Sequence, residues 1–106
     1  MKLHRIIGQV TLSRGHAGYA NARLLLAEPE GWTAIGGPRE SAPDLIVVWD
    51  DLGAGEGSRV AVSDGAEAAQ PFRPELKAVD AYNAAIIDCV HVDPRAVARI
   101  QFDQPE

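Results

Sequence analysis

The feature that most constrains the fold is the segment 47–62, where two apolar, strand-like runs flank a turn rich in glycine. The turn Gly53-Ala54-Gly55-Glu56-Gly57 follows the run Val47-Val48-Trp49 and precedes Val60, after which apolar and polar residues alternate with period two. A phosphate-binding glycine loop leads instead from a strand into a helix, whose N-terminal N–H groups hold the anion. The segment therefore predicts strand, tight loop, strand, with an architectural loop. Glycine there suits a crowded point where several chains meet, because it allows close backbone approach or positive φ.

Length and charge exclude several classes of protein. With 106 residues, the chain is expected to form one domain, residues 1–106, with a modest core. Its 10 Lys and Arg against 15 Asp and Glu give a net charge of -5, and no basic run gathers with aromatics, so nucleic acid is not an expected partner. Cys89 is the only cysteine, and we find no signal peptide or membrane span in the sequence. These features predict a protein of the reducing cytoplasm.

Hydrophobic patterning predicts a mainly β protein. Alternating or continuous apolar runs predict five strands: Arg5–Ser13, Arg23–Glu28, Leu45–Trp49, Arg59–Ser63 and Tyr82–Val92. Ile7 interrupts the alternation of the first run, and the fourth run places Val60 and Val62 inward, with Ala61 outward. A capping box, Asp64 with Glu67, predicts a helix of one or two turns that ends before Pro71. Several short strands, with one short helix between the fourth and fifth, indicate a small five-stranded β-barrel of the OB type.

Two segments are less regular. Glu30 to Pro43 has no periodicity and is expected to be a long exposed loop from which Trp32 and Ile35 fold back onto the body. Asp93-Pro94 opens either a hairpin turn or a short helix, and we favour a hairpin that ends in Ile100-Gln101-Phe102.

Several motifs resemble one known family. Asp50-Asp51-Leu52-Gly53-Ala54-Gly55-Glu56-Gly57, followed by Val60, is similar to an aspartate, two residues and Gly-Ala-Gly-x-Gly, the most recognisable motif of the EutN/CcmL family. Met1-Lys2-Leu3 leading to Gly8-Gln9-Val10 resembles its opening strand, and Val79-Asp80-Ala81 leading to Ile86-Ile87-Asp88 resembles a pair of motifs near its end. The resemblance covers nearly the whole chain, from Met1 to Phe102. Ala78 replaces the family's usual proline, and Ser58 its usual acidic residue.

The resemblance implies a function without chemistry. Members of this family are pentameric vertex proteins of bacterial microcompartment shells, so the implied role is a structural, non-enzymatic subunit of a homopentamer. Such a pentamer caps the vertices of a cytoplasmic shell whose other partners are hexameric and trimeric shell proteins. No cofactor and no metal are expected. The alternative from another class is an OB-fold module that binds an oligonucleotide or an oligosaccharide.

The candidate site residues follow from the same resemblance. Gly53, Ala54, Gly55 and Glu56 are expected close to the five-fold axis, where they could edge a narrow pore; the alternative is an ordinary hairpin turn. Asp50, Asp80 and Asp88 lie at strand ends or inside apolar runs, where an unpaired carboxylate is costly. They are expected to accept backbone N–H bonds or to meet an arginine, within the subunit or across its boundary. The candidate arginines are Arg14, Arg23, Arg59 and Arg73.

The remaining chemistry-bearing residues do not predict a catalytic site. Cys89 and His91 share a strand face, but no third group that would orient them can be named, so inert packing is the expected role of the cysteine. His4 and His16 are expected to be polar surface groups.

Overall fold

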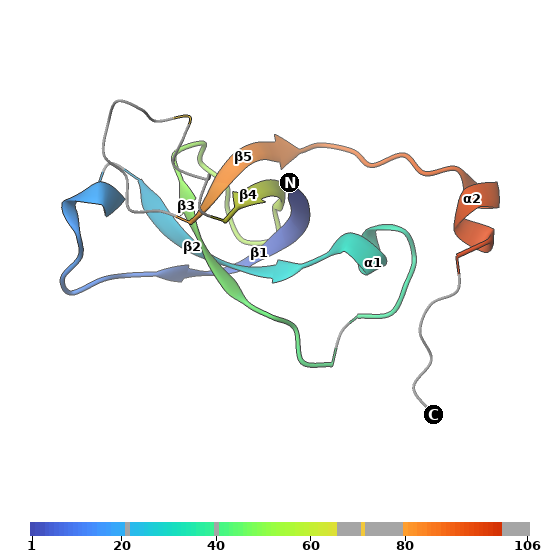
Figure 1. Ribbon diagram of the computed structural model, residues 1–106, viewed down its shortest axis with the longest axis horizontal. Helices are drawn as coiled ribbons and strands as arrows, with labels where there is room; N and C mark the ends of the chain where they lie inside the picture. Colours follow the sequence, from blue (N-terminus) through green and yellow to red (C-terminus); the bar gives the residue numbers. More distant parts are fainter. Residues whose placement is uncertain (21, 40, 66–70, 72–79, 101–106) are drawn as a thin grey trace.

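Five antiparallel and parallel pairings close the chain into a barrel (Figure 1). The computed structural model describes residues 1–106 except 21, 40, 66–70, 72–79 and 101–106. The strands are β1 (Lys2–Val10), β2 (Arg23–Pro29), β3 (Ile46–Asp50), β4 (Arg59–Asp64) and β5 (Ala81–Ile87). Their order around the barrel is β1-β2-β3-β5-β4, with β3 and β5 parallel and the other pairs antiparallel. The predicted mainly β, five-stranded fold is confirmed.

The first strand begins earlier and ends earlier than the predicted Arg5–Ser13. Its first residues pair with β4, Lys2 opposite Val62, and its last residue, Val10, pairs with Leu24 at the start of β2. Only Arg23 precedes Leu24 in β2, so β1 stops close to the point where its partner strand begins. The interruption of the alternation at Ile7 is a β-bulge, at which the register shifts between Ile6 and Gly8 and Ile7 is left 39% exposed.

The core fills the inside of the barrel with small and branched apolar side chains. Its members come from every strand and from the β3–β4 loop: Ile6, Leu25, Ala27, Val48, Ala54, Val60, Val62 and Ala81. Val60 and Val62 point inward as predicted. Ala61, which alternation places outside, is also buried, next to a register shift between Ala61 and Val62 in the pairing with β5.

The C-terminal part differs from the predicted hairpin. Strand β5 stops at Ile87, which pairs with Arg59 at the start of β4, so residues 88–92 have no strand to extend along. Helix α2 (Pro94–Ala98) then replaces the hairpin turn. The reason is local, because the Asp93 carboxylate accepts the N–H of Arg95 at 3.0 Å and proline occupies the first turn, where its missing N–H costs nothing. Gln101 and Phe102 lie outside the described residues.

The two other connecting segments hold short helical turns. A 3-10 helix, η1 (Ala17–Tyr19), lies between β1 and β2, and helix α1 (Gly31–Ala34) opens the segment predicted as a loop without regular structure. Trp32 in α1 is 47% exposed. The predicted helix between the fourth and fifth strands falls largely on residues 66–70, outside the described residues. Within the described residues, no helix has the length and apolarity needed to cross a membrane.

Candidate functional site

The glycine-rich loop, residues 51–58, joins two strands that are not neighbours. Strand β3 lies between β2 and β5, whereas β4 lies between β1 and β5. The loop therefore passes over one end of the barrel, and the hairpin-turn interpretation is wrong. Backbone bonds with β1 hold only the end of the loop, where the Gly57 N–H donates to the Ile6 carbonyl oxygen at 2.8 Å and the Ile6 N–H donates to that of Ser58 at 2.9 Å. Other groups must hold the rest of its backbone.

The Asp50 carboxylate holds the first half of the loop. Its Oδ1 accepts the N–H of Leu52 at 3.2 Å, and its Oδ2 accepts the N–H groups of Gly53 at 3.1 Å and Ala54 at 3.0 Å. These bonds explain why an aspartate ends β3, since only a short acidic side chain can reach three successive backbone donors.

Two side chains from other strands complete the Asp50 site. The Asn83 side-chain amide donates to Oδ1 at 2.8 Å, and the Arg23 guanidinium donates to Oδ2 at 3.1 Å and also to the carbonyl oxygen of Ala54. Asp50 and Asn83 are buried, whereas the Arg23 side chain is 44% exposed. Burial raises the pKa of Asp50, but the bonds from Asn83, Leu52, Arg23 and Ala54 outweigh it and hold the pKa below its usual value. Asp50 is therefore an ionised carboxylate that fixes the loop to β2 and β5.

Within the loop, Ala54 is buried and the glycines and Glu56 are exposed. Ala54 is 1% exposed and belongs to the core, so it anchors the loop in the barrel. Gly53 and Gly57 have φ of 93° and 85°, a conformation that favours glycine. Gly55 and Glu56 are exposed; Gly55 lies outside the positive-φ region, and a Cβ built on it would meet nothing within 4 Å. The subunit itself therefore does not require glycine at position 55.

A second buried carboxylate holds the other end of the loop, and sequence reasoning missed it. Glu30 is 5% exposed and accepts bonds from Arg5 Nε at 2.8 Å and from Arg59 Nε at 2.9 Å. Arg5 also donates to the carbonyl oxygen of Gly57 at 3.1 Å. Burial raises the pKa of Glu30, but the bonds from Arg59 and Arg5 outweigh it and lower the pKa overall. The Glu30 cluster thus links β1 and β4 to the end of the loop.

The other predicted site residues are not brought together. Asp80 and Asp88 are both exposed, and their carboxylates have no ion pair or hydrogen bond with the described residues. The backbone carbonyl oxygen of Asp80 accepts the N–H of Gly65 at 2.7 Å. Arg14 is exposed in the β1–η1 connection, and Arg73 lies outside the described residues.

Two histidines and the cysteine also have definite places. His4 is 4% exposed, so its assignment to the surface is wrong, and its Nδ1 has no hydrogen-bond partner among the described residues. Extending the alternation of the first strand back to residue 4 puts His4 on the same face as Ile6. This pattern is the sequence signal that predicts the burial of His4. Cys89 Sγ lies 3.4 Å from His91 Nε2 on an exposed segment after β5. No group of three or more His, Cys, Asp or Glu side chains that could hold a metal is found among the described residues.

An OB-type binding face would need exposed aromatics beside basic residues. Trp49, on β3, is 3% exposed and its Nε1 donates to the carbonyl oxygen of Tyr19 at 3.2 Å, so it is part of the body and not a stacking platform. Arg5 and Arg23, which donate to carbonyl oxygens of the loop, are engaged with Glu30 and Asp50. Trp49 and these two arginines therefore do not form such a binding face.

Comparison with known proteins identifies the family. Residues 1–88 match the family model described as ethanolamine utilisation protein EutN/carboxysome. The bacterial microcompartment shell vertex protein EutN of Salmonella typhimurium (strain LT2) is 35% identical over 88 residues, which cover 83% of this chain and 84% of that protein.

Solved structures agree with this assignment. An ethanolamine utilization protein EutN superposes with a TM-score of 0.71 at 32% identity, covering 87% of this chain and 91% of the other. The GrpN pentameric microcompartment shell protein from Rhodospirillum rubrum gives 0.70 at 29% identity, covering 88% and 100%. CcmL from Gloeobacter violaceus gives 0.68 at 32% identity, covering 88% and 91%. The closed barrel, the Asp50-held glycine loop and these similarities together show that the chain belongs to the EutN/CcmL family.

Proposed function

We propose that the chain is a structural subunit of a homopentameric ring that caps the vertices of a bacterial microcompartment shell in the cytoplasm. Its partners are four further copies of itself and the hexameric and trimeric proteins that form the flat parts of the shell. A layer of hexagons stays flat and closes only where five-fold units are inserted. The ring therefore contributes curvature, and no catalysis is assigned to it.

The observation that carries the proposal is the membership of the EutN/CcmL family, together with the similarity to a shell vertex protein and to a pentameric shell protein. The barrel in isolation is consistent with assembly. Apolar side chains on several strands are left exposed, among them Ile7 at 39%, Val47 at 43% and Ile86 at 45%. A ring of identical subunits buries different faces of each barrel against its two neighbours, because a head-to-tail interface is heterologous.

Within the ring, we place the tip of the 51–58 loop close to the five-fold axis. The Asp50 and Glu30 clusters hold both ends of the loop, so its tip has a fixed position. Gly55 is exposed without any need of its own barrel for glycine, which is the expected pattern where copies of a backbone approach one another. Glu56 would then contribute one carboxylate per subunit to a ring around the axis.

Assembly with shell tiles tests the proposal directly. The full chain is mixed with a hexameric microcompartment shell protein, and the products are imaged by electron microscopy. Closed polyhedral particles that form only when the chain is present are the expected result. If the hexameric protein forms the same tubes or flat sheets with an equimolar amount of the chain as without it, the vertex role is contradicted.

A further inference from the structure

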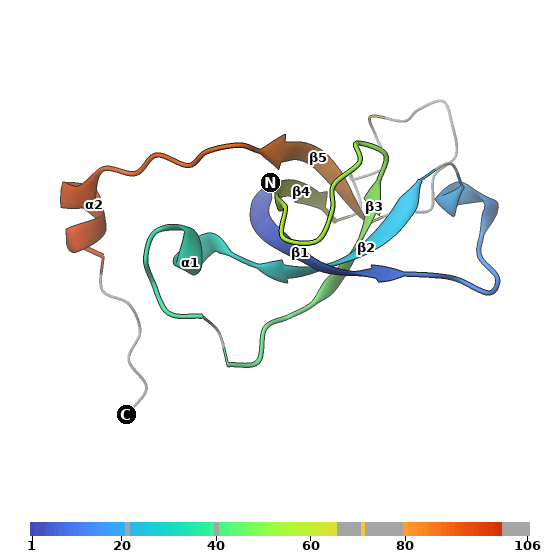
Figure 2. The ribbon, with the colours of Figure 1, turned by 180° about the vertical axis from the view of Figure 1, so that it is seen from behind.

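The segment after β5 leaves the barrel to which it belongs. Residues 89–100, here called the C-terminal arm, lead from the end of β5 to α2, and both views show α2 away from the barrel at the end of an extended stretch (Figures 1 and 2). The structure measures 46 × 26 × 24 Å, and α2 lies toward one end of the longest direction. The arm begins where the family match, residues 1–88, ends.

A helix in this position needs a partner. Helix α2 has five residues and no buried side chain, and isolated helices shorter than about 12–15 residues are marginal in water. The apolar residues on and beside α2 indicate which part of the arm the partner would contact. Val92 and Val97 occupy the two positions of a hydrophobic staple around the Asp93 cap. Ile100 follows the end of the helix, and its N–H donates to the carbonyl oxygen of Val97 at 3.0 Å. Val92 and Ile100 are 44% and 38% exposed.

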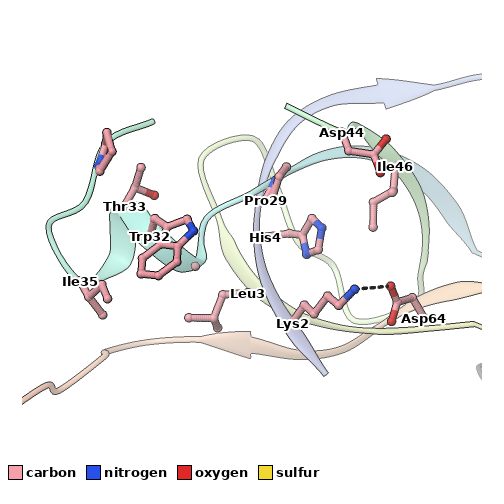
Figure 3. Close-up of a pocket in the computed structure, with 12 residues that line it drawn as sticks. Lys2, Leu3, His4, Pro29, Trp32, Thr33, Ile35, Asp44, Ile46 and Asp64 are labelled. Carbon is pink, nitrogen blue, oxygen red and sulfur yellow. Dashed lines mark ion pairs between the residues drawn. The ribbon is translucent and has the colours of Figure 1, made fainter. Parts of the chain in front are cut away.

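The barrel holds a pocket of matching character beside β1 (Figure 3). Its volume is about 570 Å³, and apolar side chains from β1, from α1 and the residue after it, and from β3 line it: Leu3, Trp32, Ile35 and Ile46. His4 forms part of the wall, and Figure 3 shows its imidazole turned toward the space between Ile46 and the Lys2–Asp64 pair. Its buried Nδ1 has no partner among the described residues, as expected where a polar partner has yet to arrive.

Charge at the pocket rim complements charge on the arm. The rim carries Asp44 and Asp64, of which Asp64 is paired with Lys2 at 3.5 Å. Asp44 is exposed and has no ion pair with the described residues. The arm brings Arg95 and Arg99 on and just after α2. The Arg95 side chain is 91% exposed, with its Nε 3.7 Å from Oδ1 of Asp93, and Arg99 is exposed. A basic helix end and an acidic rim favour one orientation of docking.

We infer that in the ring the C-terminal arm of each copy docks into the pocket beside β1 of the adjacent copy, with Val97 and Ile100 against Leu3 and Ile35. This inference depends on the proposed ring. The arm then acts as a clasp, since each subunit both donates an arm and receives one, as a closed heterologous ring requires.

Photo-crosslinking of the full chain tests the arm. Val97 is replaced by the photo-reactive residue benzoylphenylalanine, and an equal mixture of ¹⁵N-labelled and unlabelled chains is assembled, irradiated and digested for mass spectrometry. The expected links join the arm of one isotope to the peptide 29–46 of the other. The same residue at Ala98, exposed on the same helix, should give several-fold fewer of these links.

The outcomes separate the arm from the ring. Links within one chain, links to another surface, or no links in a sample whose native mass is that of five subunits would overturn the docking while leaving the ring intact. A native mass other than five subunits would overturn the ring itself. As a second measurement, Val97→Glu should raise the protomer concentration needed for half-assembly by roughly tenfold or more, whereas Ala98→Glu should change it little. Equal assembly of both variants would also overturn the docking.

Discussion

Asp50 is the residue with the most bonds in the candidate site. It is fully buried and ionised, and its donors come from β2, β5 and its own loop. A buried charge is tolerated only when its acceptors are satisfied, and here both oxygens are. The conformation of the first half of the loop therefore depends on this one carboxylate.

Replacing Asp50 should destabilise the folded subunit. Asp50→Ala leaves the Asn83 amide and the backbone donors of the loop without an acceptor, at a cost of about 2–4 kcal/mol. Urea unfolding followed by circular dichroism measures this cost. Asp51→Ala is the matched control, because Asp51 is exposed and adjacent, and it should cost less than about 0.5 kcal/mol. Equal losses for the two variants would contradict the assigned role of Asp50.

His4 should make stability depend on pH in a mildly acidic window. Burial lowers its pKa below 6.5, an effect that a backbone bond to Lys2 and the charge of Asp64 oppose and the charge of Lys2 reinforces. The unfolded chain therefore takes up a proton first as pH falls below 6.5, so the free energy of unfolding decreases until the folded-state pKa is passed. Glu30 and Asp50, whose pKa values are lowered from 4.5 and 3.8, contribute stability that is lost only at lower pH.

The pH window that belongs to His4 can be measured on its own, because Glu30 and Asp50 lose their contribution only at lower pH. Urea unfolding at a series of pH values between 7 and 5 should show the decrease in the natural chain and a flatter profile in His4→Gln. A natural chain whose unfolding free energy is constant over this range would show that the burial of His4 has no such consequence.

At the scale of elements, the sequence predicts strands better than it predicts their partners. Alternating and continuous apolar runs located β2, β3 and β4 to within about one residue at each end, and the break in alternation marked the bulge at Ile7. It did not reveal that β3 and β4 are not adjacent, because pairing depends on the whole barrel. The Glu30 cluster was hidden for the same reason, since its arginines lie 25 and 29 residues away in sequence.

Two local signals compete in the C-terminal element, and the helix cap prevails over the predicted hairpin turn. Asp93-Pro94 is both a turn signal and a helix N-cap, and Val90 to Val92 continue an apolar run. Strand β5 could continue only if β4 continued beside it, but β4 begins at Arg59. Pairing with β4 therefore does not compete with the hydrogen bonds that cap α2.

The loop allows a matched test of two glycines. Gly53 has a φ of 93° and Gly55 lies outside the positive-φ region, although neither would bring a Cβ within 4 Å of another atom. Gly53→Val should therefore destabilise the subunit by roughly 1–3 kcal/mol through backbone strain. Gly55→Val should leave the stability of the subunit nearly unchanged and hinder ring formation.

Two measurements on the same samples read out this pair. Urea unfolding at low protein concentration reports the subunit, and analytical ultracentrifugation at high concentration reports the ring. Normal rings from Gly55→Val would place the loop tip away from the axis.

At the scale of the whole molecule, a single barrel leaves apolar side chains exposed that a neighbouring copy could cover. Exposed apolar residues lie on β1, β3 and β5, and the arm ends in a helix with no buried side chain. A ring of five copies accounts for both features, because each barrel gains two different neighbours. The central claim of this account is therefore the number and symmetry of the copies.

Native mass spectrometry of the full chain at micromolar concentration, with class averages from negative-stain electron microscopy of the same sample, tests that claim most directly. The account predicts a dominant species with the mass of five chains and averages with five-fold symmetry. A sample that stays monomeric at every concentration, or that closes with six-fold symmetry, would contradict it.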